Sequence, residues 1–262
     1  MNLQNQYLRI AKEFIKPFIK DSNIVGINLS GGISRGTGDE FSELDINFYV
    51  KNKKKKGLPP EKDINVNGVW FDFHIFDFEK EKKKEWEMSY RWDSKNSRIM
   101  FDRNNFIKKL FRDKTMFKKG ERERLIKELS QKFDWSIQLS EIFEVRRDLI
   151  NAHLLVNQAL DTLIDIYFLK NGQLIPHFKW KYNLFSKLRK PNQKFKKEIF
   201  HLFLIKNFSS KELKKRINKL KSKAIQNGLK DKYSGYHKQN LQKIRDFSRS
   251  IKKEIKYEGF NW

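Results

Sequence analysis

The sequence predicts an α+β protein in which a small β-sheet precedes a bundle of α-helices. Alternating segments rich in β-branched and aromatic residues occur early in the chain, at residues 24–30, 43–50, 69–76 and 97–102. From about residue 125 onward, apolar residues recur at the three- and four-residue spacing of amphipathic helices. We therefore expect a sheet domain over residues 1–120 and a helical domain over residues 121–262, divided near Lys118-Lys119-Gly120.

The individual helices are predicted from their apolar spacing and from the signals at their ends. An amphipathic helix is expected over residues 7–19, with Pro17 distorting its end. The strongest helix is expected from Trp135 to Lys170, because Asn171-Gly172 supplies the left-handed residue that ends many helices. Further helices are expected from Phe106, after a turn at residues 103–105, and over residues 193–207, 209–227 and 236–257.

The composition limits the chemistry that the chain can perform. It contains no cysteine, which excludes disulfides, zinc–thiolate sites and cysteine nucleophiles. No apolar segment approaches the roughly 20 residues that span a membrane, and no signal-peptide pattern opens the chain. We therefore expect a cytoplasmic protein without a membrane partner.

A glycine turn followed by two carboxylates is the most informative motif. The segment Gly31-Gly32-Ile33-Ser34-Arg35-Gly36 follows the first predicted strand, and Glu43 and Asp45 begin the second. Glycines allow backbone N–H groups to approach a phosphate closely, and an arginine adds a charged fork. Residues i and i+2 of a strand share a face, so Glu43 and Asp45 project together. Two such carboxylates suit Mg²⁺, which in turn binds substrate phosphates.

A third carboxylate interrupts the next apolar strand. Asp72 lies between Phe71 and Phe73, where a carboxylate is unfavourable unless it is paired, hydrogen-bonded or metal-bound. We therefore expect Asp72 to be the third ligand. His74 shares the face of Asp72, and a hydrogen-bonded core histidine is the interpretation that we favour for it.

These motifs resemble the signature of the DNA-polymerase-β-like nucleotidyltransferases. In that family a glycine turn leads, through a loop, to two acidic residues separated by one hydrophobic residue, as Gly31-Gly32 leads to Glu43-Leu44-Asp45 here. Glu43 stands where the family mostly has Asp, and Gly32 stands where Ser is commoner. A register with Asp45 and Asn47 as the pair would lose one charge, and the loop length favours Glu43 and Asp45.

The resemblance extends to the layout of the chain. A small mixed-sheet catalytic domain followed by a helical substrate-binding domain is similar to the aminoglycoside and lincosamide nucleotidyltransferases. This similarity implies transfer of a nucleoside monophosphate from an NTP, with ATP the expected donor, to an acceptor hydroxyl. Pyrophosphate would be released.

The resemblance also implies a role for each residue of the motifs. Two Mg²⁺ ions would be held by Glu43, Asp45 and Asp72, and Asp72 would help to deprotonate the acceptor. The NTP phosphates would be bound by the turn, through Gly31, Gly32, Ser34 and Arg35. A carboxylate of the helical domain, Glu141 or Glu144, could serve as the base instead of Asp72.

The charge distribution leaves the acceptor open among three alternatives. The formal net charge is +25, and residues 178–262 contain 25 Lys and Arg against 6 Asp and Glu. Such a charge either decorates solvated helix faces or contacts a polyanion such as RNA. We expect a small hydroxylated acceptor, such as an antibiotic. The alternatives are RNA, tRNA or a protein partner, and a non-catalytic binding module with the same fold.

Two further pairs of residues are interpreted as structural. Arg147 and His153 resemble the Arg…His motif of HEPN-superfamily helical ribonucleases, but six residues of helix turn through about 600°, so the side chains would diverge by about 120°. A surface arginine and a buried polar histidine are therefore the favoured interpretation. Lys179 and Trp180 are expected to anchor a loop by packing, with a place in the cleft as the alternative.

Overall fold

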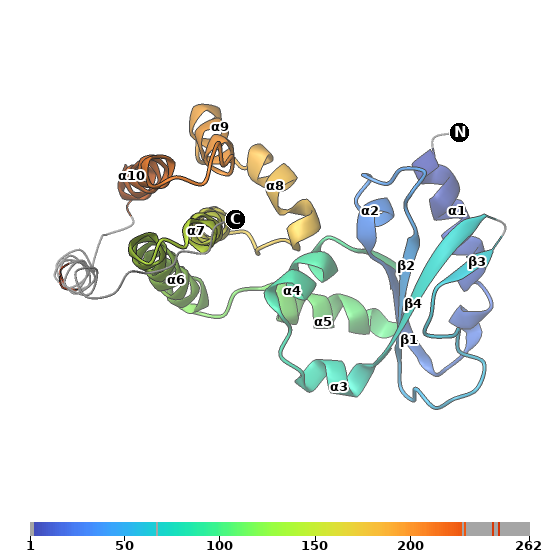
Figure 1. The fold of residues 1–262 in the computed structure, drawn as a ribbon. Coiled ribbons are helices and arrows are strands. Elements are labelled where there is room, and N and C mark those ends of the chain that lie inside the picture. Colours follow the sequence, from blue (N-terminus) through green and yellow to red (C-terminus); the bar gives the residue numbers. More distant parts are fainter. Residues whose placement is uncertain (1–2, 67, 227, 229–242, 244–245, 247–262) are drawn as a thin grey trace. The chain divides into compact units, whose positions relative to one another are not determined.

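In a computed structural model of the protein, residues 3–66, 68–226, 228, 243 and 246 are described (Figure 1). The chain divides into two compact units, Met1–Phe117 with Leu174–Lys181, and Lys118–Gln173 with Tyr182–Trp262. A compact unit need not fold alone, so the division into domains at residue 120 stays a prediction. The helix expected over residues 236–257 lies outside the described residues, apart from Lys243 and Asp246.

The first unit contains a mixed five-stranded sheet with the order β3-β4-β2-β1-β5. The strands are β1 (Ile24–Leu29), β2 (Leu44–Val50), β3 (Ile64–Val66), β4 (Val69–Asp77) and β5 (Arg98–Asp102). Strands β2 and β4 are parallel, and the other neighbouring pairs are antiparallel. Helices follow from residue 106 onward, so the predicted α+β class is confirmed.

One face of the sheet packs against α1 (Leu3–Ile15). The apolar residues that alternate along β2 and β4 lie on this face, and Phe48, Phe71 and Phe73 are at most 1% exposed. The Phe14 ring of α1 lies 4.8 Å from the Phe71 ring and 4.9 Å from the Phe73 ring. Helix α1 ends two residues before Pro17, and a separate turn, η1 (Phe18–Lys20), follows it.

The opposite face is covered at one end and carries polar side chains at the other. Helices α3 (Phe78–Lys83), α4 (Met88–Lys95) and α5 (Phe106–Thr115) supply the cover, with the short turn η2 (Arg103–Asn105) before α5. They enclose a second apolar cluster that includes Tyr49 and Ile107, both fully buried. Asp45 and Asp72 lie toward the other end of the strands.

The second unit is made of helices. They are α6 (Glu121–Val145), α7 (Leu149–Lys170), α9 (Gln193–Leu202) and α10 (Ser210–Gln226), and α8 (Phe178–Lys187) begins in the segment grouped with the first unit. Helices α6 and α7 pack along one another, and α7 carries much of the buried apolar surface. Of the helices that the structure describes, none combines the length and apolar character needed to cross a bilayer.

The prediction of one continuous helix from Trp135 to Lys170 is wrong. The chain breaks between α6 and α7 because Arg147 adopts a left-handed conformation with φ of 65°. The Asp148 side chain then accepts a hydrogen bond from the Asn151 N–H at 3.0 Å and caps the start of α7. Apolar spacing continues on both sides of the break, which is why the periodicity did not reveal it.

A buried arginine joins three helices of this unit. Arg216 of α10 is 2% exposed and donates hydrogen bonds to the Leu202 carbonyl at 2.7 and 2.9 Å, to His153 Nδ1 at 2.8 Å and to Asn157. His153 is fully buried, and burial together with the adjacent guanidinium lowers its pKa. Arg147 is exposed, so the prediction of a surface arginine and a buried polar histidine is confirmed.

We expect Arg216→Met to destabilise the protein by about 2–4 kcal/mol, because several buried acceptors would lose their donor. Chemical denaturation followed by circular dichroism measures the effect. Lys219→Met on the exposed side of the same helix is the matched control. Equal stability of the two variants would show that the buried network contributes little.

Candidate active site

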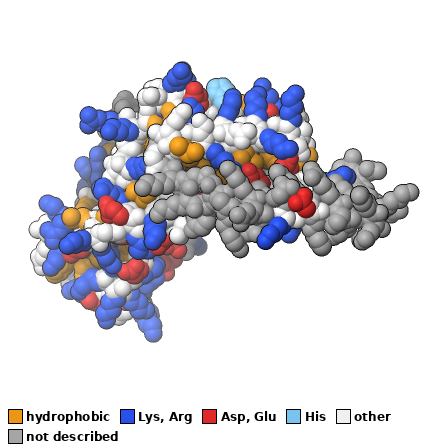
Figure 2. All heavy atoms as spheres, turned by 90° about the vertical axis from the view of Figure 1, so that its left-hand side faces the viewer, with side chains coloured by type: hydrophobic (Ala, Val, Ile, Leu, Met, Phe, Trp, Pro, Cys, Tyr) orange, Lys and Arg blue, Asp and Glu red, His pale blue; other side chains and the backbone are white. Residues whose placement is uncertain are grey.

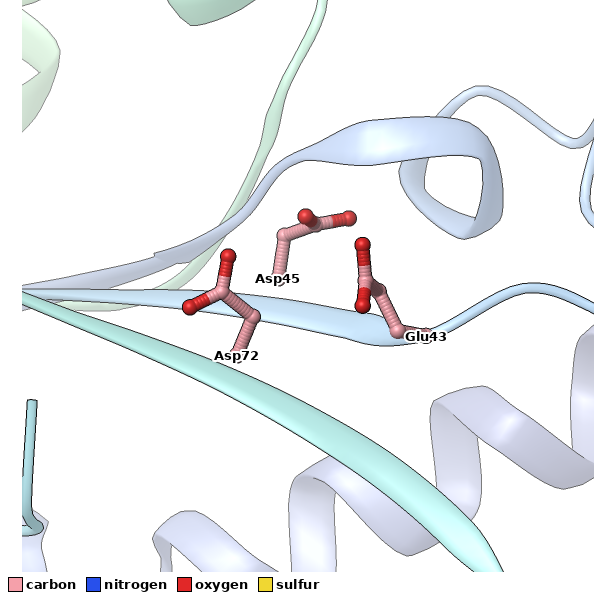
Figure 3. A group of neighbouring side chains, drawn as sticks. All are labelled: Glu43, Asp45 and Asp72. Atoms are coloured by element: carbon pink, nitrogen blue, oxygen red, sulfur yellow. The ribbon is translucent and has the colours of Figure 1, made fainter. Parts of the chain in front are cut away.

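Three carboxylates meet at the end of the sheet that α3, α4 and α5 leave uncovered. Asp45 of β2 and Asp72 of β4 are direct neighbours in the parallel register, and Glu43 comes immediately before β2. Each offers an oxygen within 4.8 Å of the others. Figure 3 shows the three side chains turned toward one another. The structure therefore brings together the three residues that the sequence predicts as ligands.

The cluster carries more negative charge than the protein neutralises. Burial and, to a lesser degree, the nearby carboxylates of Glu43, Asp72 and Asp93 together raise the pKa of Asp45 to about 7, against the opposing effect of the Arg35 guanidinium. Asp45 therefore holds a proton at pH values where an ordinary aspartate is ionised. A divalent cation among these oxygens would displace that proton. Three hard oxygen donors are the ligand set that Mg²⁺ or Mn²⁺ prefers.

His74 differs from its prediction as a core histidine. Its side chain is 52% exposed, and its Nε2 atom lies 3.1 Å from Asp72 Oδ2. The prediction failed because this face of β4 is open to solvent at His74, while the other face supplies the core. His74 therefore gives Asp72 a solvent-exposed neighbour within hydrogen-bond distance.

The glycine turn lies against Asp45. Residues Gly31–Ser34 form the single helical turn α2, and Gly31 has φ of +70°. A Cβ atom on Gly31 would stand 1.7 Å from Asp45 Oδ2, so any larger residue would occupy the position of the carboxylate. The Ser30 N–H donates to the Asp45 carbonyl at 2.9 Å and ties the turn to β2. The backbone of the turn is thus held beside the carboxylates.

The other residues of the turn are less constrained or are engaged locally. A Cβ atom on Gly32 would meet only ordinary van der Waals contacts, the nearest at 3.5 Å from Trp180. The Ser34 hydroxyl donates to the Gly31 carbonyl at 2.9 Å. Phosphate binding by Gly31, Gly32 and Ser34 stays a prediction. The donors available for it are backbone N–H groups.

Arg35 is held by residues that the sequence did not single out for it. Its guanidinium pairs with Asp93 at 2.5 Å and packs over two indole rings, 4.9 Å from the Trp92 centroid and 4.7 Å from that of Trp180. The side chain is 11% exposed. Trp180 comes from the segment Leu174–Lys181, which belongs to the first unit. Trp180 therefore packs as an anchor next to the glycine turn, and phosphate contact by Arg35 stays a prediction.

The two glutamates considered as alternative bases are engaged within the helical unit. Glu144 pairs with Lys214 at 3.0 Å, and Glu141 pairs with Lys221 at 2.9 Å. Both ion pairs join α6 to α10. A role for either glutamate as a base would require its ion pair to open first.

Comparisons with known proteins give limited similarity. No protein-family model matches the sequence, and no curated protein matches it. Among solved structures, the chain is similar to a nucleotidyltransferase-like protein from Exiguobacterium sibiricum 255-15, with 14% identity and a TM-score of 0.48. The match covers 83% of this chain and 74% of the other.

We expect Gly31→Ala to destabilise the protein by at least ~2 kcal/mol, because the residue has a left-handed backbone and its Cβ would collide with Asp45. Mn²⁺ binding, measured by isothermal titration, should weaken as Asp45 is displaced. Gly32→Ala has room for its methyl group and is the matched control. Identical unfolding midpoints for the two variants would contradict the close approach of Gly31 to Asp45.

We expect Asp45→Asn to stabilise the protein at pH 8 without divalent ions. The folded state raises the pKa of Asp45 from 3.8 to about 7, so the wild type loses stability as the pH rises through this window. The shift corresponds to at most about 4 kcal/mol. The difference in unfolding free energy between the variant and the wild type should therefore reach its full value above pH 7 and disappear toward pH 4.

Thermal unfolding across this pH range measures the effect, with Asp63→Asn, an exposed carboxylate outside the cluster, as the control. Added Mg²⁺ should stabilise the wild type and not Asp45→Asn. A variant that is less stable than the wild type at pH 8 would show that Asp45 is not under electrostatic strain.

Proposed function

We propose that this chain is a divalent-metal-dependent nucleotidyltransferase that moves a nucleoside monophosphate from an NTP to a hydroxyl group of a small acceptor. One observation carries the proposal: Glu43, Asp45 and Asp72 converge within 4.8 Å directly beside a glycine turn. Carboxylates alone would fit many metal sites. Carboxylates next to a closely approaching glycine backbone fit an ion that is shared with phosphate groups.

The carboxylate cluster would hold Mg²⁺, and we assign it two ions, as the resemblance implies. When bound there, Mg²⁺ would lower the pKa of the acceptor hydroxyl and offset the charge of the phosphates. The raised pKa of Asp45 supports this assignment, because burial and three neighbouring carboxylates leave the site short of positive charge. ATP is the donor that we propose to test first.

The NTP phosphates would bind on the side of the glycine turn, and the acceptor hydroxyl would bind on the side of Asp72. The backbone N–H groups of Gly31 and Gly32 would donate hydrogen bonds to the phosphates. The Arg35 guanidinium would add positive charge nearby, since it is close enough to Asp45 to lower the pKa of that carboxyl. Asp72 would accept the proton of the acceptor hydroxyl and pass it to His74, whose exposed ring lies 3.1 Å away. The acceptor oxygen then bonds to the α-phosphorus as the bond to the bridging oxygen breaks and pyrophosphate leaves.

RNA is a second candidate acceptor, favoured by the basic surface of the helical unit. Lys211, Lys215 and Lys219 are exposed along α10 at four-residue spacing. Figure 2 shows Lys and Arg side chains spread over the face drawn there, among fewer acidic ones. A surface of this kind suits a polyanion held by its backbone charge.

The deciding experiment incubates the full chain with each of the four NTPs labelled at the α-phosphorus, Mg²⁺, total tRNA and a panel of antibiotics. Label on a small molecule supports the first proposal, and label on RNA supports the second. If no acceptor is labelled and no Mg²⁺-dependent NTP binding is seen, the chain is a non-catalytic module.

We expect Glu43→Gln to reduce nucleotidyl transfer by at least ~100-fold, because the metal site loses a charged ligand. The fold should be unaffected, since Glu43 is exposed and precedes β2. Initial rates and circular dichroism of Glu43→Gln are compared with those of Glu40→Gln, an exposed neighbour outside the cluster. Undiminished transfer by Glu43→Gln would refute its role as a metal ligand.

A further inference from the structure

An exposed tryptophan lies beside the carboxylate cluster. Trp70 of β4 precedes Asp72 by two residues, so both side chains project from the same face of the strand. The parallel register pairs Leu44 with Phe71, and extending it by one residue places Trp70 opposite Glu43. The indole therefore stands in the row next to that of Asp45 and Asp72.

Trp70 is exposed although its neighbours on the strand are buried. It is 54% exposed, whereas Phe71 and Phe73 are each 1% exposed. Phe71 and Phe73 stack on one another with centroids 5.5 Å apart, and Trp70 makes no such ring contact with the described residues. Leaving a large apolar ring in water is unfavourable, so an exposed indole at a site edge suggests a binding role.

The position of Trp70 in the sheet indicates which substrate it would meet. The strand order β3-β4-β2-β1 puts Trp70 on one side of Asp45 and the glycine turn that follows β1 on the other. In an in-line displacement the attacking and leaving oxygens lie on opposite sides of the phosphorus. With the leaving phosphates at the glycine turn, the acceptor approaches from the side of β4.

We propose that Trp70 is a stacking platform for a planar unsaturated ring of the acceptor. This inference rests on the proposed function, because it uses the direction of transfer to separate acceptor from donor. The ring could be a nucleobase at the end of an RNA or an aromatic group of a small molecule. Loss of one stacked ring weakens binding by roughly tenfold to a hundredfold.

The test uses ¹⁹F NMR of the full chain labelled with 5-fluorotryptophan. The chain has six tryptophans, and the Trp70 resonance is assigned from the spectrum of Trp70→Phe. Trp135, which is 53% exposed on α6, provides an internal control of matched exposure. Two pairs of probes are added with Mg²⁺ and α,β-methylene-ATP: phenyl and methyl β-glucoside, and triadenylate RNA and ribose 5-phosphate.

Stacking predicts that the member of a pair that has a planar ring shifts the Trp70 resonance, while its ring-free partner and the Trp135 resonance show no change. A response to phenyl glucoside identifies a small aromatic acceptor, and a response to triadenylate identifies an RNA end. Trp70→Ala should weaken binding of the active probe roughly tenfold to a hundredfold, and Trp70→Phe should retain most of it.

Two results would overturn the inference. The first is that no ring-containing probe changes the chemical shift of Trp70. The second is that α,β-methylene-ATP alone changes this shift as much as the probes do. Mn²⁺ added to the same sample tests the proposed function separately, because an ion bound by Glu43 and Asp72 would broaden the adjacent Trp70 signal. Absence of broadening would refute the proposed metal site, whereas the measurement of stacking on Trp70 would remain valid.

Discussion

The parallel pairing of β2 with β4 is the constraint on which the site depends. This pairing places Asp45 beside Asp72 with no intervening residue, and strand alternation adds Glu43 on the same face. Like charges so placed repel one another, and half-burial increases the repulsion by removing solvent. The apolar residues that alternate with these carboxylates fill the core on the other face. The same strands thus bring the carboxylates together on one face and supply, on the other face, the apolar packing that offsets their repulsion.

The arrangement around Arg35 follows from this excess of negative charge. Without other partners, a guanidinium beside these three carboxylates would be drawn into the cluster. Asp93 and the rings of Trp92 and Trp180 hold it at the edge, where it still influences Asp45. The ion pair and the two indoles therefore keep the positive charge of Arg35 in a fixed position near Asp45.

Much of the site could be predicted from the sequence because strand geometry is local. Alternation alone indicates that Glu43 and Asp45 share a face, and an aspartate between two phenylalanines indicates a special environment for Asp72. The prediction for His74 failed because alternation identifies a face without showing whether that face is covered. The partners of Arg35 were missed since Asp93 and Trp180 reach it through tertiary packing. The break at Arg147 was hidden because the apolar spacing continues through it.

The segment Leu174–Lys181 has a consequence for how the protein is made. It belongs to the first unit although α6 and α7 separate it from the rest of that unit in the chain. On the ribosome the strands of the sheet and Trp92 emerge before α6 and α7, but Trp180, the second indole that packs on Arg35, emerges only after both helices have been synthesised. The nascent chain therefore carries the carboxylates before the edge of the site is complete. Completion of the site is therefore tied to synthesis of the chain as far as Trp180.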